Sequence, residues 1–224
     1  MAITTKSINY KYIYLGMIVS TCILSAKIEQ LSLPLNFTVL SQNRMEGIYY
    51  RNANQSINLC FYDDDISPTY QRSDEHPLIF YKNNPKPSVI GKIVLPRKQS
   101  NNWILLFIKN EEPTNSNLPY RIIPIQRSSL NLLTSHLTFI NTTTVPLACK
   151  INNNKPAIIQ PGLNKPIRIP TGKLTLSTIG NFENILRQAF VRQFSSKAKS
   201  KTLVIIYPPI LKGSPQLIPK FIQL

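Results

Sequence analysis

The sequence predicts an all-β protein, built as one or two antiparallel β-sandwich domains after an N-terminal signal segment. Short apolar runs rich in Ile, Val, Tyr and Phe recur along the chain and are separated by Pro, Asn and Ser, which is typical of strands. The 224 residues include 18 prolines and 7 glycines, which suits strands joined by rigid turns. Hydrophobic residues make up 42% of the chain, enough for a packed core, so wholesale disorder is excluded.

The first element is an export signal. Lys6 and Lys11 precede an apolar stretch from Tyr12 to Leu24, and the small residues Ser25 and Ala26 follow. This order is typical of a secretory signal. The apolar stretch is shorter than the about 20 residues that a membrane-spanning helix needs. We therefore expect residues 1–26 to be a signal peptide or anchor and the rest of the chain to be exported, as a periplasmic, envelope-associated or extracellular protein.

Three fates remain open for this segment. Cleavage after Ala26 would leave Leu24 where a small residue is preferred, so the cleavage site is poor. The run that ends in Cys22 loosely resembles a bacterial lipobox, in which the cysteine would be acylated. An uncleaved helix that anchors the chain is the third possibility. In each case only the N-terminal segment would contact the membrane.

The strands expected after this segment follow from the apolar runs. Trp103–Ile108 and Leu203–Tyr207 are continuously apolar, so we expect these two to lie at sheet centres with both faces covered. In order, the predicted strands are Asn36–Leu40, Gly47–Arg51, Ser56–Tyr62, Pro77–Tyr81, Ser88–Leu95, Asn102–Lys109, Tyr120–Ile125, Leu137–Asn141, Val145–Ile151, Pro156–Gln160, Lys165–Ile169, Lys173–Ile179 and Thr202–Tyr207.

The strand predicted at residues 56–62 alternates between two faces. Ile57, Leu59 and Phe61 would share its buried face, and the residues between them, including Cys60, would lie on the other.

Residues 181–194 fit two structures. Their apolar residues recur at helical spacing behind Asn181, a possible helix cap. As a strand from Leu186 to Phe194, the same segment would also place its large apolar residues on one face. We favour the strand, turned at Ser195–Ser200 into a hairpin with Thr202–Tyr207.

The best position for a domain boundary lies between Pro124 and Ser135, which predicts β-rich domains at 27–125 and 126–224. A weak internal echo supports two related units. Pro77–Pro87 and Pro146–Pro156 both begin with Pro-Leu and end in an Asn-rich turn followed by Lys-Pro.

The C-terminal third carries a resemblance. A strand ending in Phe-x-Asn (Leu137–Asn141) is followed by Val145–Leu147, the Pro-Gly turn of Ile159–Gly162 and a last apolar strand ending in Pro (Leu203–Pro208). This order resembles the C-terminal part of a group of uncharacterised exported bacterial proteins with a predicted β-sandwich fold. The resemblance implies the fold and the compartment, and it implies no activity and no site residues.

Motifs for catalysis are missing from the sequence. The only histidines are His76 and His136, and there is no nucleophile elbow, zinc-protease motif, Walker loop or glycine-rich dinucleotide turn. We therefore expect neither catalysis nor a cofactor. A hydrolase with a dispersed acidic site, using residues such as Asp63, Asp65 and His76, remains an alternative.

The strongest metal-site candidate is an acidic cluster in the loop before residue 77. Calcium prefers several oxygen ligands that converge from a loop. The spacing matches no known calcium loop, so a solvated polar loop is the simpler interpretation. The candidate ligands are Asp63, Asp64, Asp65, Asp74 and Glu75.

Cys60 and Cys149 are candidates for a disulfide in an oxidising compartment. Two buried free thiols are the favoured interpretation, because each cysteine lies in a separate predicted strand.

The charge of the chain is strongly asymmetric. The formal net charge is +16, and after Glu112 the chain holds fourteen basic residues against a single acidic one, Glu183. A field of this size attracts polyanions. The residues expected to bind anions are Arg187, Arg192, Lys197, Lys199 and Lys201.

These features predict an exported cell-envelope protein with a binding or structural role, in contact with anionic envelope polymers or lipid head groups. The alternative is a basic nucleic-acid-binding protein in which Phe190 or Tyr207 stacks on bases. A third possibility is that the charge is compositional and serves no partner.

Overall fold

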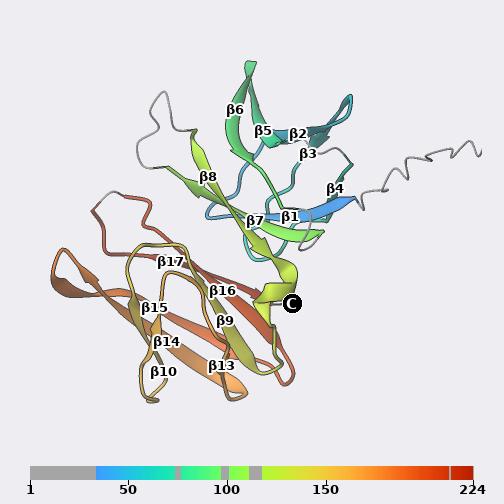
Figure 1. Ribbon diagram of the computed structural model, residues 1–224. Helices are drawn as coiled ribbons and strands as arrows, with labels where there is room; N and C mark the ends of the chain where they lie inside the picture. Colours follow the sequence, from blue (N-terminus) through green and yellow to red (C-terminus); the bar gives the residue numbers. More distant parts are fainter. Residues whose placement is uncertain (1–33, 74–76, 97–100, 111–117, 212, 224) are drawn as a thin grey trace, which may run out of the picture. The chain divides into compact units, whose positions relative to one another are not determined.

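The computed structural model describes residues 34–73, 77–96, 101–110, 118–211 and 213–223. The only helical element in these residues is one 3-10 turn, η1 (Arg127–Leu130), and all other elements are β-strands (Figure 1). The predicted all-β fold is therefore confirmed. Residues 32–224 make up one compact unit. For description, strands β1–β8 are called the first half and strands β9–β17 the second half.

The first half contains two four-stranded sheets that enclose an aromatic core. Phe37, Tyr50, Phe80 and Phe107 lie in this core and are at most 1% exposed. Their rings meet mostly edge to face, for example Phe80 and Phe107 with centroids 4.9 Å apart. In order across each sheet, the strands are β4 (Tyr70–Arg72), β1 (Leu35–Ser41), β7 (Asn102–Lys109) and β8 (Tyr120–Gln126), then β3 (Gln55–Asn58), β2 (Ile48–Asn52), β5 (Leu78–Asn84) and β6 (Lys86–Ile93).

The second half also contains two sheets around a buried core, which includes Leu137, Phe139, Leu176 and Val204. One sheet has the order β12 (Gly162–Leu163), β9 (His136–Asn141), β16 (Lys201–Tyr207) and β17 (Ile218–Gln223), and β13 (Ile167–Arg168) also pairs with β9. The other has the order β11 (Ala157–Ile159), β10 (Leu147–Ile151), β14 (Gly172–Phe182) and β15 (Ile185–Ser196). No described strand pairs with a strand of the other half.

The two halves repeat one topology. In each half the first strand pairs in parallel with the last strand but one, β1 with β7 and β9 with β16, and the remaining pairs are antiparallel in the same order. A β-bulge also recurs at the same place. The register shifts after Phe80 in the β5–β6 pair and after Thr178 in the β14–β15 pair. The unpaired extra residues, Ile90 and Ala189, are both buried. Bulges are local features that random resemblance rarely reproduces, so the chain contains a structural duplication.

A third buried cluster contains residues from both halves. Leu40, Leu106 and Leu130 of the first half belong to it, together with Ile205 and Tyr207 of the second half. Alternate residues of β7 face this cluster or the first core, and alternate residues of β16 face this cluster or the second core. The prediction that both continuously apolar strands have two covered faces is therefore confirmed.

The predicted strands are largely confirmed, with corrections at their ends and partners. The helix considered for residues 181–194 is wrong, since residues 181–182 end β14, residues 183–184 form a turn and residues 185–194 lie in β15, where the favoured strand Leu186–Phe194 is confirmed. The predicted hairpin is also wrong, because β15 pairs with β14 along its length and β16 belongs to the other sheet. The strand predicted at residues 56–62 ends at Asn58, although Leu59 and Phe61 are buried as expected. Strands β4, β12 and β17 were not predicted.

The internal echo at Pro77–Pro87 and Pro146–Pro156 paired the wrong segments, since the first contains β5 and the second β10. In the duplicated topology β10 corresponds to β2, and β5 corresponds to β14. The division into domains at 27–125 and 126–224 stays a prediction, because independent folding of the halves is a separate property from their sheet topology.

Candidate anion-binding surface

Basic side chains gather at one end of the second half. Across three neighbouring strands, Arg168 of β13 lies opposite His136 of β9, and His136 lies beside Lys201 of β16. Neighbouring strands in a sheet are about 5 Å apart, and side chains at paired positions project on the same face. The pairing therefore creates a row of basic residues from positions that are far apart in the sequence.

The turn between β15 and β16 adds Lys197 and Lys199 to this end. Ser200 closes the turn by donating from its backbone nitrogen and its hydroxyl to the Lys197 carbonyl, at 3.2 and 2.8 Å. Ser135 in turn donates to the Ser200 carbonyl at 2.8 Å, which ties the turn to the start of β9. Lys173 of β14 also lies here, opposite Ser195.

We call this set the basic end, and it comprises His136, Arg168, Lys173, Lys197, Lys199 and Lys201. The only acidic residue of the chain after Glu112 is Glu183, which lies at the other end of the β14–β15 hairpin. Because β14 begins at Gly172 and ends at Phe182, that distance is about 33 Å at about 3.3 Å per residue. The positive charge of the basic end is therefore not offset by a nearby side-chain carboxylate of the second half.

The first half provides an internal comparison for this row. By the same pairing, Gln71 of β4 lies opposite Asn36 of β1, and Asn36 lies beside Asn102 of β7. The row that is basic in the second half is thus uncharged in the first, although strand order and register match. The fold therefore does not require cations at these positions.

Only part of the predicted anion-binding set comes together. Lys197, Lys199 and Lys201 share the basic end, but Arg187 lies opposite Gly180 near the other end of β15. Arg192 lies between them, opposite Leu176, and lines a hollow of about 270 Å³ with Asp63 and Lys220. Arg187 and Arg192 are only a few residues from Lys197 in the sequence, but an extended strand rises about 3.3 Å per residue, so they lie far from it in space.

Lys220 is a buried cation that sequence analysis missed. Its side chain is 6% exposed, and its Nζ donates to the carbonyls of Ser41 at 2.9 Å and Tyr62 at 2.8 Å. Burial lowers the pKa of Lys220, and the charges of Asp63 and Asp64 oppose that shift. The signal that could have found it is its position inside the apolar C-terminal run Ile218–Ile222, where a lysine needs polar partners.

The acidic cluster is only partly described. Asp63, Asp64 and Asp65 are exposed, and an Asp65 carboxylate oxygen accepts a hydrogen bond from the Ile66 backbone nitrogen at 2.7 Å. Asp74 and Glu75, with His76, lie outside the described residues. Within the described ranges, no group of three His, Cys, Asp or Glu side chains could hold a metal ion. The cation site thus stays a prediction.

Of the three cysteines, Cys60 and Cys149 lie among the described residues, and both are free thiols in this structure, without the candidate disulfide between them. Cys149 is buried in the second core, whereas Cys60 is exposed, which corrects the expectation that both are buried. Cys60 is exposed because its neighbours Leu59 and Phe61 take the core-facing positions. Cys22, the lipidation candidate, lies outside the described residues.

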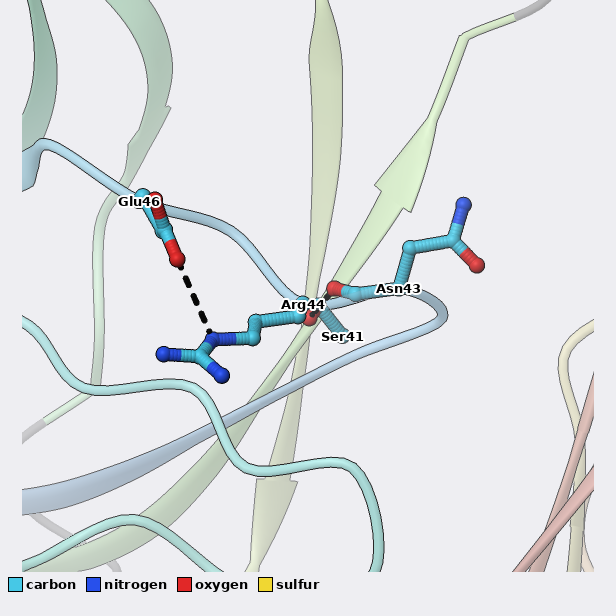
Figure 2. Close-up of polar contacts among 4 residues, drawn as sticks. All are labelled: Ser41, Asn43, Arg44 and Glu46. Carbon is cyan, nitrogen blue, oxygen red and sulfur yellow. Dashed lines mark hydrogen bonds and ion pairs between the residues drawn. The ribbon is translucent and has the colours of Figure 1, made fainter.

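Cys60 lines a groove of about 450 Å³ next to the turn that follows β1. Figure 2 shows the polar contacts within this turn, which join its two charged side chains to each other. Arg44 reaches Glu46 with its Nε 3.2 Å from a carboxylate oxygen, and the Ser41 hydroxyl donates to the Asn43 carbonyl. Arg44 and Glu46 pair with each other, and the remaining charged residue that lines the groove is Asp63, so the lining has no net positive charge that would attract an anion.

Burial of Cys149 predicts a pH dependence of stability. Desolvation raises the pKa of its thiol from 9.0 to about 12. The unfolded chain therefore loses this proton before the folded chain does, so the stabilisation is complete below pH 9 and is lost as the pH rises toward 12. We expect the free energy of unfolding of Cys149→Ala to fall less steeply between pH 9 and 11 than that of the wild type, by up to about 1.4 kcal/mol per pH unit.

The measurement is urea unfolding at several pH values, with Cys60→Ala as the control. Parallel pH profiles for Cys149→Ala and the wild type would contradict the prediction.

Comparisons with known proteins assign no family to this chain. No model of a known protein family matches it, and no curated protein sequence matches it. In the described part of the chain, no helix has the length and hydrophobicity that a membrane span requires.

Proposed function

We propose that this protein is an exported component of the cell envelope that binds anionic polymers through its basic end and carries out no catalysis. The observation that carries this proposal is the convergence of six basic residues at one end of the second half, on a scaffold whose first half has uncharged residues in the equivalent row. The export signal expected at residues 1–26 supports this proposal, because an exported protein would meet such polymers.

The physical basis is multivalent electrostatic attraction. Each exposed Lys or Arg contributes about 1 kcal/mol next to a densely charged anionic surface at low salt. A polymer with regularly spaced charges can contact several of these residues at once, whereas a single small anion cannot. Neutralising phosphates releases counterions, so the binding should weaken steeply as the salt concentration rises.

Nucleic acid is a weaker alternative for this surface. The aromatic residues expected to stack on bases are unsuited to that role, because Tyr207 is fully buried and Phe190 packs against the second core. Unpaired bases are bound largely by stacking on exposed rings, in addition to contacts with the phosphates. The charge alone does not distinguish a nucleic acid from other polyanions, so the experiment includes both.

The test measures binding to long-chain polyphosphate with a variant that neutralises the basic end, Arg168→Gln/Lys199→Asn/Lys201→Asn. Arg168→Gln and Lys201→Asn introduce the residue types that stand at the equivalent first-half positions, Gln71 and Asn102. At residue 199, asparagine suits the positive φ of 62°. The control, Lys82→Gln/Lys86→Gln/Lys92→Gln, removes as much charge from exposed positions of the first half. We expect the first variant to weaken binding by roughly 30- to 100-fold at low salt and to reduce the salt dependence, while the control changes the affinity little.

Equal losses in the two variants would contradict the proposal, because net charge rather than the basic end would then decide binding. Tighter binding to single-stranded DNA than to polyphosphate would favour the nucleic-acid alternative.

Export is tested by the intact mass of the protein isolated from its own cells. A mass beginning near residue 27, or at a lipidated Cys22, supports export, and a full-length soluble cytosolic protein would contradict it.

A further inference from the structure

A second positively charged site lies away from the basic end, in a cleft of about 440 Å³. Its walls come from the end of β7 and start of β8, the loop at residues 142–145, the tip of the β14–β15 hairpin, and the segment after β16. A volume of this size is within the range of about 300–1,000 Å³ that is usual for small-molecule sites.

Three cations line the cleft, Lys109, Arg121 and Arg187, together with one carboxylate, Glu183. One guanidinium nitrogen of Arg121 donates to the Thr142 carbonyl at 3.4 Å, which leaves its other donors available. The only ion pair within the described ranges is that of Arg44 with Glu46, so Glu183 pairs with none of the three cations. The cleft therefore has a net positive charge from its described residues.

The loop at residues 142–145 is held rigidly by Asn141, which is 1% exposed. The Asn141 amide nitrogen donates to the Val145 carbonyl at 2.9 Å, and its oxygen accepts from the Thr143 backbone nitrogen at 3.1 Å and hydroxyl at 2.8 Å. The Thr142 hydroxyl donates to the Ile206 carbonyl at 2.8 Å. These bonds fix the loop before any ligand arrives, which limits the entropy lost on binding.

The apolar part of the cleft is equally constrained. Phe182 packs over Gly180 so closely that a Cβ at residue 180 would lie 2.7 Å from its ring. On the other side, Leu217 donates from its backbone nitrogen to the Ala189 carbonyl at 3.1 Å, and it is 4% exposed. The cleft thus combines cations, hydroxyl groups and an apolar surface in fixed positions.

We propose that this cleft binds a small ligand that carries an oxyanion, a carboxylate or a phosphate, on an uncharged body. Arginine presents a planar set of donors that matches both kinds of oxyanion, and Arg121 and Arg187 supply two such groups. Thr142 and Thr143 use their hydroxyls within the protein, so the Thr144 hydroxyl and the ring of Phe182 suit the uncharged body of the ligand. The site is separate from the basic end, because Arg187 and Lys197 are ten residues apart on an extended chain, about 33 Å.

The test titrates the full chain with two anionic probes, glucuronate and glycerol 3-phosphate, and with their uncharged counterparts, glucose and glycerol, by isothermal calorimetry. We expect saturable binding of at least one anionic probe, with its uncharged counterpart binding at least tenfold more weakly. Comparing the two anionic probes shows whether the site prefers a carboxylate or a phosphate.

The variants Arg121→Gln and Arg187→Gln should each weaken binding by about tenfold or more. Arg192→Gln is the matched control, since Arg192 is an exposed arginine of the same strand that does not line the cleft. Thermal unfolding of each variant checks that the fold is intact. Failure of both anionic probes to saturate, equal binding of an uncharged counterpart, or an equal loss in Arg192→Gln would overturn the proposal.

Discussion

Replacing Leu106 with alanine is expected to lower the free energy of unfolding by about 2–5 kcal/mol. Leu106 is 0% exposed at the centre of β7, in the buried cluster that contains residues of both halves. Truncation removes buried apolar surface and leaves a cavity whose walls, formed by two central strands, have little freedom to relax. Urea unfolding of the variant and the wild type measures this difference.

The control is Leu133→Ala, because Leu133 is 44% exposed and its truncation should cost little. A loss below about 1 kcal/mol for Leu106→Ala would show that the shared cluster is loosely packed.

The same urea unfolding of the wild type also tests whether the two halves unfold as separate domains. Because one cluster contains residues of both halves, we expect a single unfolding transition, and two separate transitions in the wild type would contradict that expectation.

Replacing Lys220 with methionine is expected to cost about 2–4 kcal/mol, the second largest effect. Methionine has a similar length, so the apolar stem is conserved, but the two carbonyls that accept from Nζ, those of Ser41 and Tyr62, lose their partner. Unlike a buried side-chain ion pair, which an apolar pair can replace, these acceptors belong to the backbone and stay in place.

Chemical denaturation of Lys220→Met measures the loss, and Lys165→Met, at an exposed position, is the matched control. Equal stability of Lys220→Met and the wild type would contradict the account, because it would mean that water satisfies both carbonyls as well as the lysine does.

Local patterns were sufficient to predict most strands and their burial. The alternation at Ile57, Leu59 and Phe61 identified the buried face, and the continuous apolar runs identified the two central strands, β7 and β16. Pairing was harder to predict. In β15, the large apolar residues fit a helix and a strand equally well, and the bulge at Ala189 changes the register in a way that no local pattern indicates.

The duplication was hidden because equivalent core positions share burial and differ in residue type. By strand pairing, Tyr50 corresponds to Cys149, and Phe80 corresponds to Thr178. All four are buried, with exposures of 2% or less. A core conserves its packed volume as a whole, so one position can change from aromatic to small while its neighbours compensate.

The basic end was only partly predictable, because some of its residues come together through strand pairing that the sequence does not show. The run Lys197–Lys201 is visible in the sequence, and it contributes three of the six residues of the basic end. His136 and Arg168 join them only through strand pairing across β9, β13 and β16. The cleft shows the same limit, because Arg121 and Arg187 are far apart in the chain.

The most direct test of the central claim, that the basic end is the surface that binds anionic polymers, is lysine acetylation read by mass spectrometry with and without polyphosphate. The account predicts that the polymer protects Lys173, Lys197, Lys199 and Lys201, while the exposed first-half lysines at positions 82, 86 and 92 react at the same rate. Uniform protection of all these lysines, or protection confined to the first half, would contradict it.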